Sequence, residues 1–199
     1  STAEILALLR RTEGLQGKVW PVPGEGTLLP ETYHFSYGDS RQDVVRRMAV
    51  AMRGLLVNLW RNRAPGLPFV SPGEAVVLAS IVEKETSLPA ERPHVAAVFI
   101  NRIKRGMRLQ SDPTVVYGLT RGAGPLERSL TQADLKTASP YNTYLVGGLP
   151  PGPIANPGSA SLEAVLRPAK SNDLYFVADG QGGHVFAETL KEHNRNVAQ

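Results

Sequence analysis

The segment from Ala79 to Thr86 reads Ala-Ser-Ile-Val-Glu-Lys-Glu-Thr and places two carboxyl groups at the end of an otherwise apolar helical run. At 100° per residue, Glu85 falls beside the apolar side chains of Leu78 and Ile81, whereas Glu83 falls toward the polar side of the helix. A carboxyl group among apolar neighbours loses hydration, which disfavours its charged form and raises its pKa. The pattern therefore predicts that Glu85 is a proton donor that keeps its proton near neutral pH.

The two glutamates cannot act as facing carboxylates, because residues i and i+2 of a helix do not face each other. An active site here therefore uses one glutamate or needs a distant partner. For Glu83 we expect a salt bridge or a helix-terminal hydrogen bond, with proton donation as its alternative role. For Glu85 the alternative is a solvent-exposed carboxylate in the last helical turn, which is the ordinary state of a glutamate.

The composition is that of an ordinary soluble globular domain. Of the 199 residues, 42% are hydrophobic and 20% are charged, so we expect one well-buried core. The chain contains no cysteine, and the histidines at positions 34, 94, 184 and 193 lack ligand spacing, so we expect neither a disulfide nor a metal site. The net charge of +4 indicates only a mild attraction to anionic polymers.

A basic cluster lies at the end of a helix expected over residues 91–105. It consists of Arg102, Lys104, Arg105 and Arg108. Cations at a helix C-terminus interact favourably with the helix dipole, and no aromatic side chains that could stack on bases are interleaved with them. The cluster therefore favours helix capping, and nucleic-acid binding is its weaker alternative.

Helical spacing and capping signals predict two main helices. Apolar residues keep helical spacing from Ser40 to about Arg63, and the capping box Ser71-Pro72-Gly73-Glu74 begins the helix that carries Glu85. Shorter helices are expected over residues 3–11, 91–105, 161–166 and 189–197. Residues 174–177 and 184–187, separated by a glycine-rich turn, predict a hairpin. The fold class is thus α+β, with helices packed against a small, mostly antiparallel sheet that includes the C-terminal hairpin.

The segments that connect these elements carry two further expectations. Residues 145–157 contain four prolines and must form a loop, of the kind that often walls a cleft. No apolar run approaches the ~20 residues needed to cross a bilayer, and no signal peptide opens the chain. Because the first residue is Ser1 rather than Met, we expect an excised fragment whose targeting segment lies upstream.

Several segments together resemble one protein family. They are Glu25–Tyr33, Ala79–Thr86, Val98–Arg102, Met107–Gly118, Tyr141–Tyr144, Gly148–Ile154 and Leu174–Gly180. In this order and spacing, spread over about residues 25–197, they closely resemble the catalytic region of the endolytic murein transglycosylases, also called the YceG-like family.

The resemblance implies a bacterial lyase that cuts peptidoglycan glycan strands internally. It would cleave the MurNAc-GlcNAc glycosidic bond and leave 1,6-anhydro-MurNAc ends, with no metal or organic cofactor. Family members are anchored in the inner membrane by one N-terminal helix, face the periplasm and act near peptidoglycan synthases, the penicillin-binding proteins. That anchor and the LysM-like region that usually follows it are absent from residues 1–199, which we expect to form a single YceG-like catalytic domain.

The resemblance also assigns site residues. The family's catalytic residue is the second glutamate of the Glu-Lys-Glu run, which is Glu85, in agreement with the argument from the helix face. One carboxyl group can serve twice, first as the acid and then as the base that activates the sugar's own C6 hydroxyl. The expected substrate-binding residues are Gln110, Ser111, Asp112, Thr114, Tyr117, Tyr141, Asn142 and Tyr144.

Structural roles are the alternative for part of this set, since Asp112 before Pro113 can cap a helix and Tyr117 can belong to the core. Glu31 and Tyr33 are weaker candidates for substrate binding, because the turn that contains them can exist for its backbone geometry alone.

Two other functions stay open beside lytic cleavage. A non-catalytic peptidoglycan-binding or scaffolding domain would organise cell-wall synthesis without turnover. A conventional muramidase would need a second carboxylate across the cleft from Glu85, for which Asp112 and Glu31 are the candidates.

Overall fold

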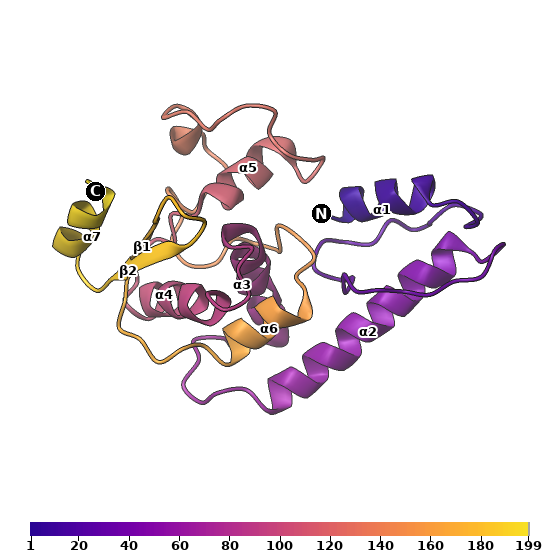
Figure 1. Cartoon of the computed structure of the whole chain (residues 1–199), viewed down its shortest axis with the longest axis horizontal. Helices are drawn as coiled ribbons and strands as arrows, with labels where there is room; N and C mark the ends of the chain where they lie inside the picture. Colours follow the sequence, from indigo (N-terminus) through magenta and orange to yellow (C-terminus); the bar gives the residue numbers. More distant parts are fainter. Residues whose placement is uncertain (199) are drawn as a thin grey trace.

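The computed structural model describes residues 1–198 and is built mainly from helices (Figure 1). Its elements in chain order are α1 (Thr2–Arg11), α2 (Arg41–Arg61), α3 (Pro72–Glu85), α4 (Arg92–Lys104), α5 (Asp112–Thr120), the 3-10 helix η1 (Asp134–Lys136), α6 (Ser159–Leu166), β1 (Tyr175–Ala178), β2 (His184–Ala187) and α7 (Leu190–Val197). Within the described residues the strands form a single antiparallel pair. The expected α+β class is confirmed.

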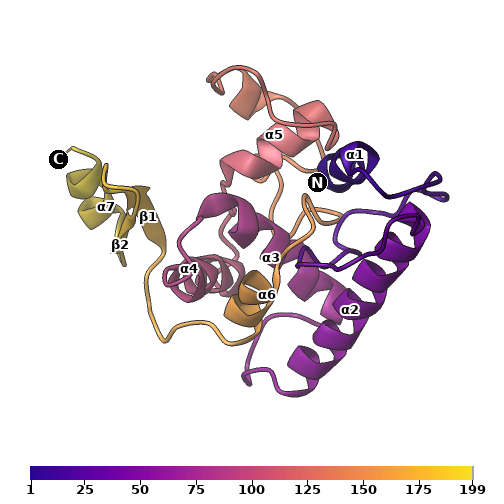
Figure 2. The ribbon, with the colours of Figure 1, turned by 45° about the vertical axis from the view of Figure 1, so that its right-hand side comes forward.

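Helix α3 lies at the centre of the main core. All eight residues from Ala75 to Val82 are buried, so this helix is apolar on every side, as a fully enclosed helix must be. It packs against α4 and α6, and more lightly against α2 and α5 (Figure 2). Ser71 accepts a hydrogen bond from the Glu74 amide and begins α3, as predicted. The other half of the expected capping box is not formed, because the Glu74 carboxylate accepts from the Val70 amide instead of the Ser71 amide. The helix ends with Glu85 at the edge of this core.

A second hydrophobic cluster joins α1 to the first half of α2. Its buried members are Leu6, Leu9, Leu15, Leu28, Val44, Val45 and Met48. The later residues Met52 and Leu59 of α2 belong to the main core instead. The long helix α2 therefore contributes to both clusters along its 21 residues.

The C-terminal hairpin stands at the opposite end of the molecule from α1 and is attached to α4 (Figures 1 and 2). In the hairpin, Tyr175 pairs with Ala187 and Ala178 with His184. On α4, the ring of His94 stacks on Phe186 with a centroid distance of 3.6 Å, and Asn101 donates to the carbonyl oxygens of residues 171 and 173 at 2.9 and 3.0 Å. These contacts hold the hairpin and the segment before it against α4, from His94 in its first turn to Asn101 near its end.

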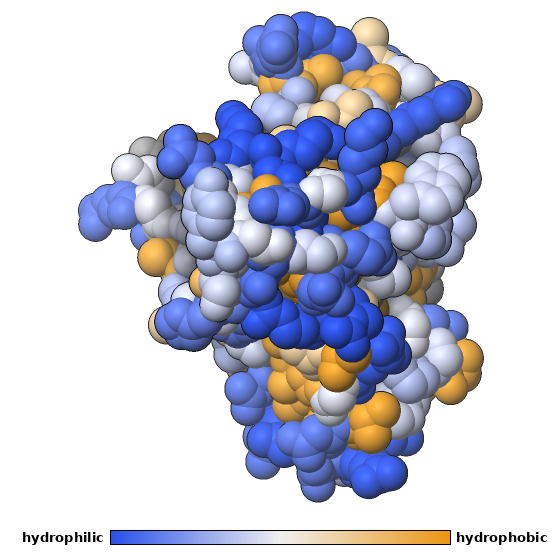
Figure 3. All heavy atoms as spheres, turned by 90° about the vertical axis from the view of Figure 1, so that its right-hand side faces the viewer, coloured by the Kyte–Doolittle hydropathy of each residue, from blue (hydrophilic) through white to orange (hydrophobic). Residues whose placement is uncertain are grey.

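The face that carries α1 and α2 is mostly hydrophilic and is interrupted by small apolar groups (Figure 3). Exposed apolar side chains on these helices include Leu8, Val50 and Val57. Scattered apolar side chains are normal on a protein surface and assign no function to this face.

Two segments outside the main helices bear on the sequence predictions. Residues 145–157 form a loop, as expected, and residues 149–153 wall a cavity of about 720 Å³ together with parts of α2 and α3. Helix α5 entered the sequence analysis only as the helix that Asp112 could cap, because its nine residues are too few to show a clear periodicity. That capping role is wrong, since Asp112 is the first helical residue and Ser111 is the N-cap. The start of α5 does carry a local signal, since Pro113 occupies the first helical turn.

Gly26 provides a test of how tightly the proline-rich loop is packed. Gly26 and Gly66 both have positive φ, +76° and +71°, but a Cβ on Gly26 would lie 2.6 Å from Pro153 and 2.8 Å from Val76, whereas nothing lies within 4 Å at Gly66. We expect Gly66→Ala to cost about 1 kcal/mol from backbone strain, and Gly26→Ala about 3 kcal/mol because of the added clash. Urea denaturation measures both, and equal losses would contradict the packing argument.

Candidate active site

Glu85 is the last residue of α3, and its carboxyl group is half-buried at the edge of the core. The Ser111 hydroxyl donates a hydrogen bond to Glu85 Oε1 at 2.5 Å. Burial is the largest influence on Glu85 and raises its pKa to about 7. The negative charge of Asp112 also raises this pKa. The Ser111 hydrogen bond and the charges of His184 and Arg102 lower it. The raised pKa expected from the apolar helix face is confirmed, and near neutral pH a large fraction of Glu85 carries a proton.

Ser111 is an N-cap residue whose side chain does not cap its helix but bonds to Glu85. It is the N-cap of α5, where a serine normally accepts a hydrogen bond from a backbone amide of the first turn. In this structure α5 has no side-chain cap, and the Ser111 hydroxyl donates to Glu85 instead. Gln110, just before it, has a positive φ of 52°, which is uncommon for a residue other than glycine. The backbone is thus turned so that the hydroxyl points at the carboxyl group.

A buried hydrogen-bond network holds Ser111 in this position. The Ser111 amide donates to the Thr143 hydroxyl at 3.0 Å, and the Thr114 hydroxyl donates to the Ser111 carbonyl oxygen at 2.6 Å. The two threonine hydroxyls also lie 2.8 Å apart. Both threonines are fully buried, and their hydrogen bonds hold the Ser111 backbone.

Asp112 and Tyr144 form a second pair beside Glu85. The Tyr144 phenol donates to Asp112 Oδ1 at 2.7 Å. Burial and then this hydrogen bond raise the pKa of Tyr144, so its hydroxyl stays protonated at physiological pH. Asp112 is exposed to solvent and is the other carboxylate whose charge acts on Glu85.

The remaining predicted binding residues lie in the surrounding scaffold. Asn142 is buried, and its amide donates to the carbonyl oxygens of Leu135 and Thr137 at 3.0 and 2.8 Å. The rings of Tyr117 and Tyr141 lie 4.8 Å apart and pack against the main core. Of the eight expected binding residues, the structure therefore brings Ser111, Asp112 and Tyr144 to Glu85, with Gln110 exposed beside Ser111.

Glu83 serves a different purpose from Glu85. Its Oε2 accepts hydrogen bonds from the Gly158 amide at 3.0 Å and the Ser161 hydroxyl at 2.7 Å, and its Oε1 lies 3.5 Å from an Arg92 guanidinium nitrogen. Gly158 is the N-cap of α6 and has no side chain for capping, so Glu83 supplies the acceptor from α3. The expected helix-terminal hydrogen bond and salt bridge of Glu83 are confirmed.

Glu31 lies near the same helix end rather than beside Glu85. The Ser159 hydroxyl in α6 donates to Glu31 Oε1 at 3.2 Å, and the carboxylate is exposed. It is not among the charged groups that act on the pKa of Glu85.

Three residues of the site have no local signal in the sequence. Arg102 is buried, and it donates to the carbonyl oxygens of Leu174 and Leu109 at 2.7 and 2.6 Å. Arg102 lies in the last turn of α4, as the basic cluster at the helix end implied, but its guanidinium is buried by these tertiary contacts. His184 Nδ1 lies 2.8 Å from Glu91 Oε2, and the His184 amide donates to Glu91 Oε1 at 2.9 Å. Glu91 and His184 are 93 positions apart, so periodicity does not reveal the pair.

The comparisons with known proteins place the chain in a family. The family model described as the YceG-like family matches residues 2–199. The chain belongs to the YceG-like family. It is 42% identical over 174 residues to an endolytic murein transglycosylase of Bacillus subtilis, covering 87% of this chain and 47% of that protein. It is 34% identical over 182 residues to one of Streptococcus pneumoniae, covering 88% and 32% respectively.

A solved structure of the YceG-like family supports the same fold. The crystal structure of a YceG-like protein from Listeria monocytogenes matches with a TM-score of 0.71 and 37% sequence identity, covering 98% of this chain and 62% of that one. The chain spans about half or less of the length of the curated relatives it matches.

The described part of this YceG-like chain offers neither a metal cluster nor a membrane span. Among residues 1–198, no group of three or more His, Asp or Glu side chains is arranged to hold a metal ion. In the same range, no helix combines the length and apolar character needed to cross a bilayer.

Removing the carboxyl group of Glu83 tests its structural role. Glu83→Ala leaves the buried Ser161 hydroxyl and the α6 amide without their acceptor, so we expect a loss of about 2 kcal/mol in the free energy of unfolding. Glu163→Ala, in an exposed pair on α6, is the control and should change it by less than about 0.5 kcal/mol. Chemical denaturation measures both, and comparable losses would argue against the capping role.

Ser111→Ala should raise the pKa of Glu85 above about 7, because the hydroxyl stabilises the carboxylate form. Carbon-13 NMR of the carboxyl group during a pH titration measures the midpoint. Ser87→Ala, at an exposed serine two residues beyond Glu85, is the control and should leave the midpoint unchanged. A midpoint that stays at the parent value in Ser111→Ala would show that the hydroxyl does not act on Glu85 in solution.

Proposed function

We propose that this chain is the catalytic part of an endolytic peptidoglycan lytic transglycosylase, which cleaves the MurNAc-GlcNAc bond and forms 1,6-anhydro-MurNAc ends. The observation that carries the proposal is Glu85, one carboxyl group with a pKa of about 7 that is held by a dedicated hydroxyl donor. The names of the relatives from Bacillus subtilis and Streptococcus pneumoniae support the reaction class.

In the first step, protonated Glu85 acts as a general acid. It gives its proton to the glycosidic oxygen while the bond from that oxygen to C1 of MurNAc breaks, and positive charge develops on the sugar ring. Glu85 becomes a carboxylate, which the Ser111 hydroxyl stabilises by donating to Oε1. The Ser111 hydrogen bond therefore strengthens as the proton leaves.

In the second step, the Glu85 carboxylate acts as the base. The C6 hydroxyl of the same MurNAc attacks C1, forms the C1–O6 bond and loses its proton to Glu85, which returns to its starting state. No water is consumed, and attack within one sugar has the proximity advantage of an intramolecular reaction. One carboxyl group therefore suffices, whereas a hydrolase needs two.

The residues around Glu85 take supporting roles in this reaction. Asp112, Tyr144 and Gln110 contact the sugar from the edge of the site, where Asp112 carries a negative charge that favours the oxocarbenium-like state. Thr114 and Asn142 act indirectly by holding Ser111 and the loop before Tyr144. Tyr117 and Tyr141 contribute an aromatic wall.

The same proposal covers the surroundings of the whole protein. The whole protein would act on the periplasmic side of the bacterial inner membrane, anchored by an N-terminal helix outside residues 1–199. Its partners there would be the glycan strands and the penicillin-binding proteins that polymerise them.

Mass spectrometry of the products from purified glycan strands tests the reaction. We expect 1,6-anhydro-MurNAc ends from the parent and from Glu83→Gln, and a rate at least about 100-fold lower from Glu85→Gln, since the amide cannot donate the proton. The rate of the parent should also fall as the pH rises above about 7, where Glu85 loses its proton. Glu83→Gln is the matched control, because it alters a glutamate of the same helix but keeps an oxygen acceptor for α6.

Other products would assign other functions. Reducing ends that disappear in Asp112→Asn would favour a conventional muramidase with Asp112 as the second carboxylate. Binding of strands without any cleavage by the folded parent would favour a non-catalytic peptidoglycan-binding module.

A further inference from the structure

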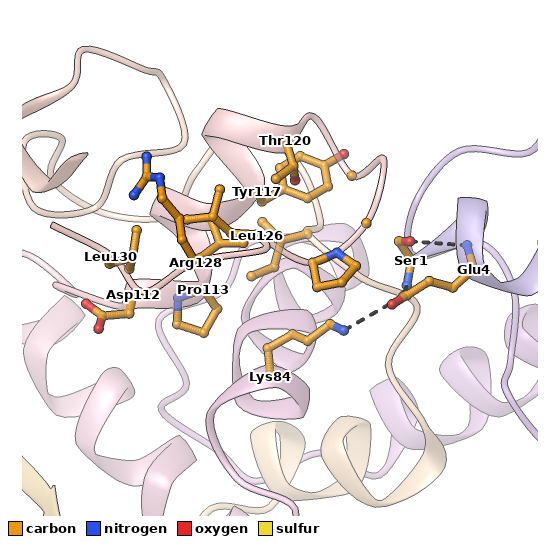
Figure 4. Close-up of a pocket in the computed structure, with 15 residues that line it drawn as sticks. Ser1, Glu4, Lys84, Asp112, Pro113, Tyr117, Thr120, Leu126, Arg128 and Leu130 are labelled. Carbon is orange, nitrogen blue, oxygen red and sulfur yellow. Dashed lines mark hydrogen bonds and ion pairs between the residues drawn. The ribbon is translucent and has the colours of Figure 1, made fainter.

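A cavity of about 420 Å³ lies between the end of α3, helix α5 with the loop that follows it, and the start of α1 (Figure 4). Its volume is in the range of roughly 300–1,000 Å³ found for small-molecule sites in proteins. The lining includes Lys84 and Asp112, together with apolar side chains such as Val116 and Leu126.

This cavity adjoins the Glu85 site through Asp112, which lines it and whose charge acts on Glu85, although neither Glu85 nor Ser111 is part of the lining. Lys84 immediately precedes Glu85, and Asp112 immediately follows Ser111, which donates to Glu85. A polymer bound with one linkage at Glu85 continues in both directions from that linkage. The cavity is therefore placed to receive a neighbouring unit of the same strand.

The lining also has the chemistry of a sugar site. Val116, Leu126 and Ile154 give apolar wall, which suits the C–H faces of a sugar ring, and Lys84 and Thr120 offer hydrogen-bonding groups for oxygen atoms at its edges. Figure 4 shows the Lys84 side chain extended along the cavity toward α1.

The ammonium group of Lys84 is only loosely engaged. It lies 3.9 Å from Glu4, and the two side chains are 42% and 51% exposed, so this ion pair contributes little. Arg128 differs, because it is held by Asp134 through two hydrogen bonds of 2.6 and 2.9 Å. Among the basic side chains of the lining, Lys84 is thus the one free to donate to a ligand.

We propose that this cavity is a saccharide subsite, which holds an N-acetylated hexosamine unit of the glycan strand next to the linkage cleaved at Glu85. Lys84 donates to an acetyl or hydroxyl oxygen of that unit, and the apolar wall packs on its ring. The subsite rests on the proposed function for its substrate, a glycan strand that extends past the cleavage point.

Binding to an inactive chain provides the first test. In a Glu85→Gln background, calorimetry with peptidoglycan glycan oligomers should show that Lys84→Met weakens binding about 10-fold, the loss of one hydrogen bond from a charged donor. Lys104→Met is the matched control, since this exposed lysine also ends a helix but does not line the cavity. Amide NMR shifts during the titration should include residues 116–124 and Leu126.

Turnover by the otherwise unmodified chain provides the second test. Thr120→Trp, which fills the cavity, and Lys84→Met should each raise KM for long strands with little change in kcat. If the parent forms anhydro ends but both variants match Lys104→Met in binding and KM, the subsite is wrong and the function stands. If the parent forms no product, the function fails, and the calorimetry and NMR shifts alone decide whether the cavity binds saccharide.

Discussion

The burial of α3 is the constraint on which the rest of the structure depends. A helix that is apolar on every side must be surrounded, and α2, α4, α5 and α6 are arranged to do so. The same burial removes water from the end of the helix, where Glu85 lies. Desolvation is the largest influence on the pKa of this carboxyl group. The packing that stabilises the fold therefore also raises the pKa of Glu85.

The two glutamates at the end of α3, Glu83 and Glu85, lie in different environments. Their i, i+2 spacing sends them to different faces of the helix. Glu83 meets the amide end of α6, which attracts a negative charge, and its oxygens are engaged by Gly158, Ser161 and Arg92. Glu85 receives a single hydroxyl donor and keeps a pKa near neutrality. The first environment ties two elements of the core together, and the second raises the pKa of its carboxyl group.

The segment before α5 departs from ordinary local preferences at the place where chemistry is proposed. Gln110 adopts a positive φ, and the N-cap hydroxyl of Ser111 leaves the helix uncapped. Such departures persist only where surrounding contacts compensate for them, and here Thr114 and Thr143 provide those contacts. Departures from local backbone and capping preferences are expected at functional sites, and Gln110 and Ser111 show two of them.

The sequence by itself determined the elements whose signals are local. The serine cap before α3, the hairpin and the face of Glu85 follow from spacings of a few residues. The apolar neighbours on that face supply the desolvation that raises the pKa of Glu85. Only the tertiary structure decided that Arg102 is buried against Leu174 and that His184 meets Glu91. These contacts depend on the path of the chain between distant elements, which neither periodicity nor propensity specifies.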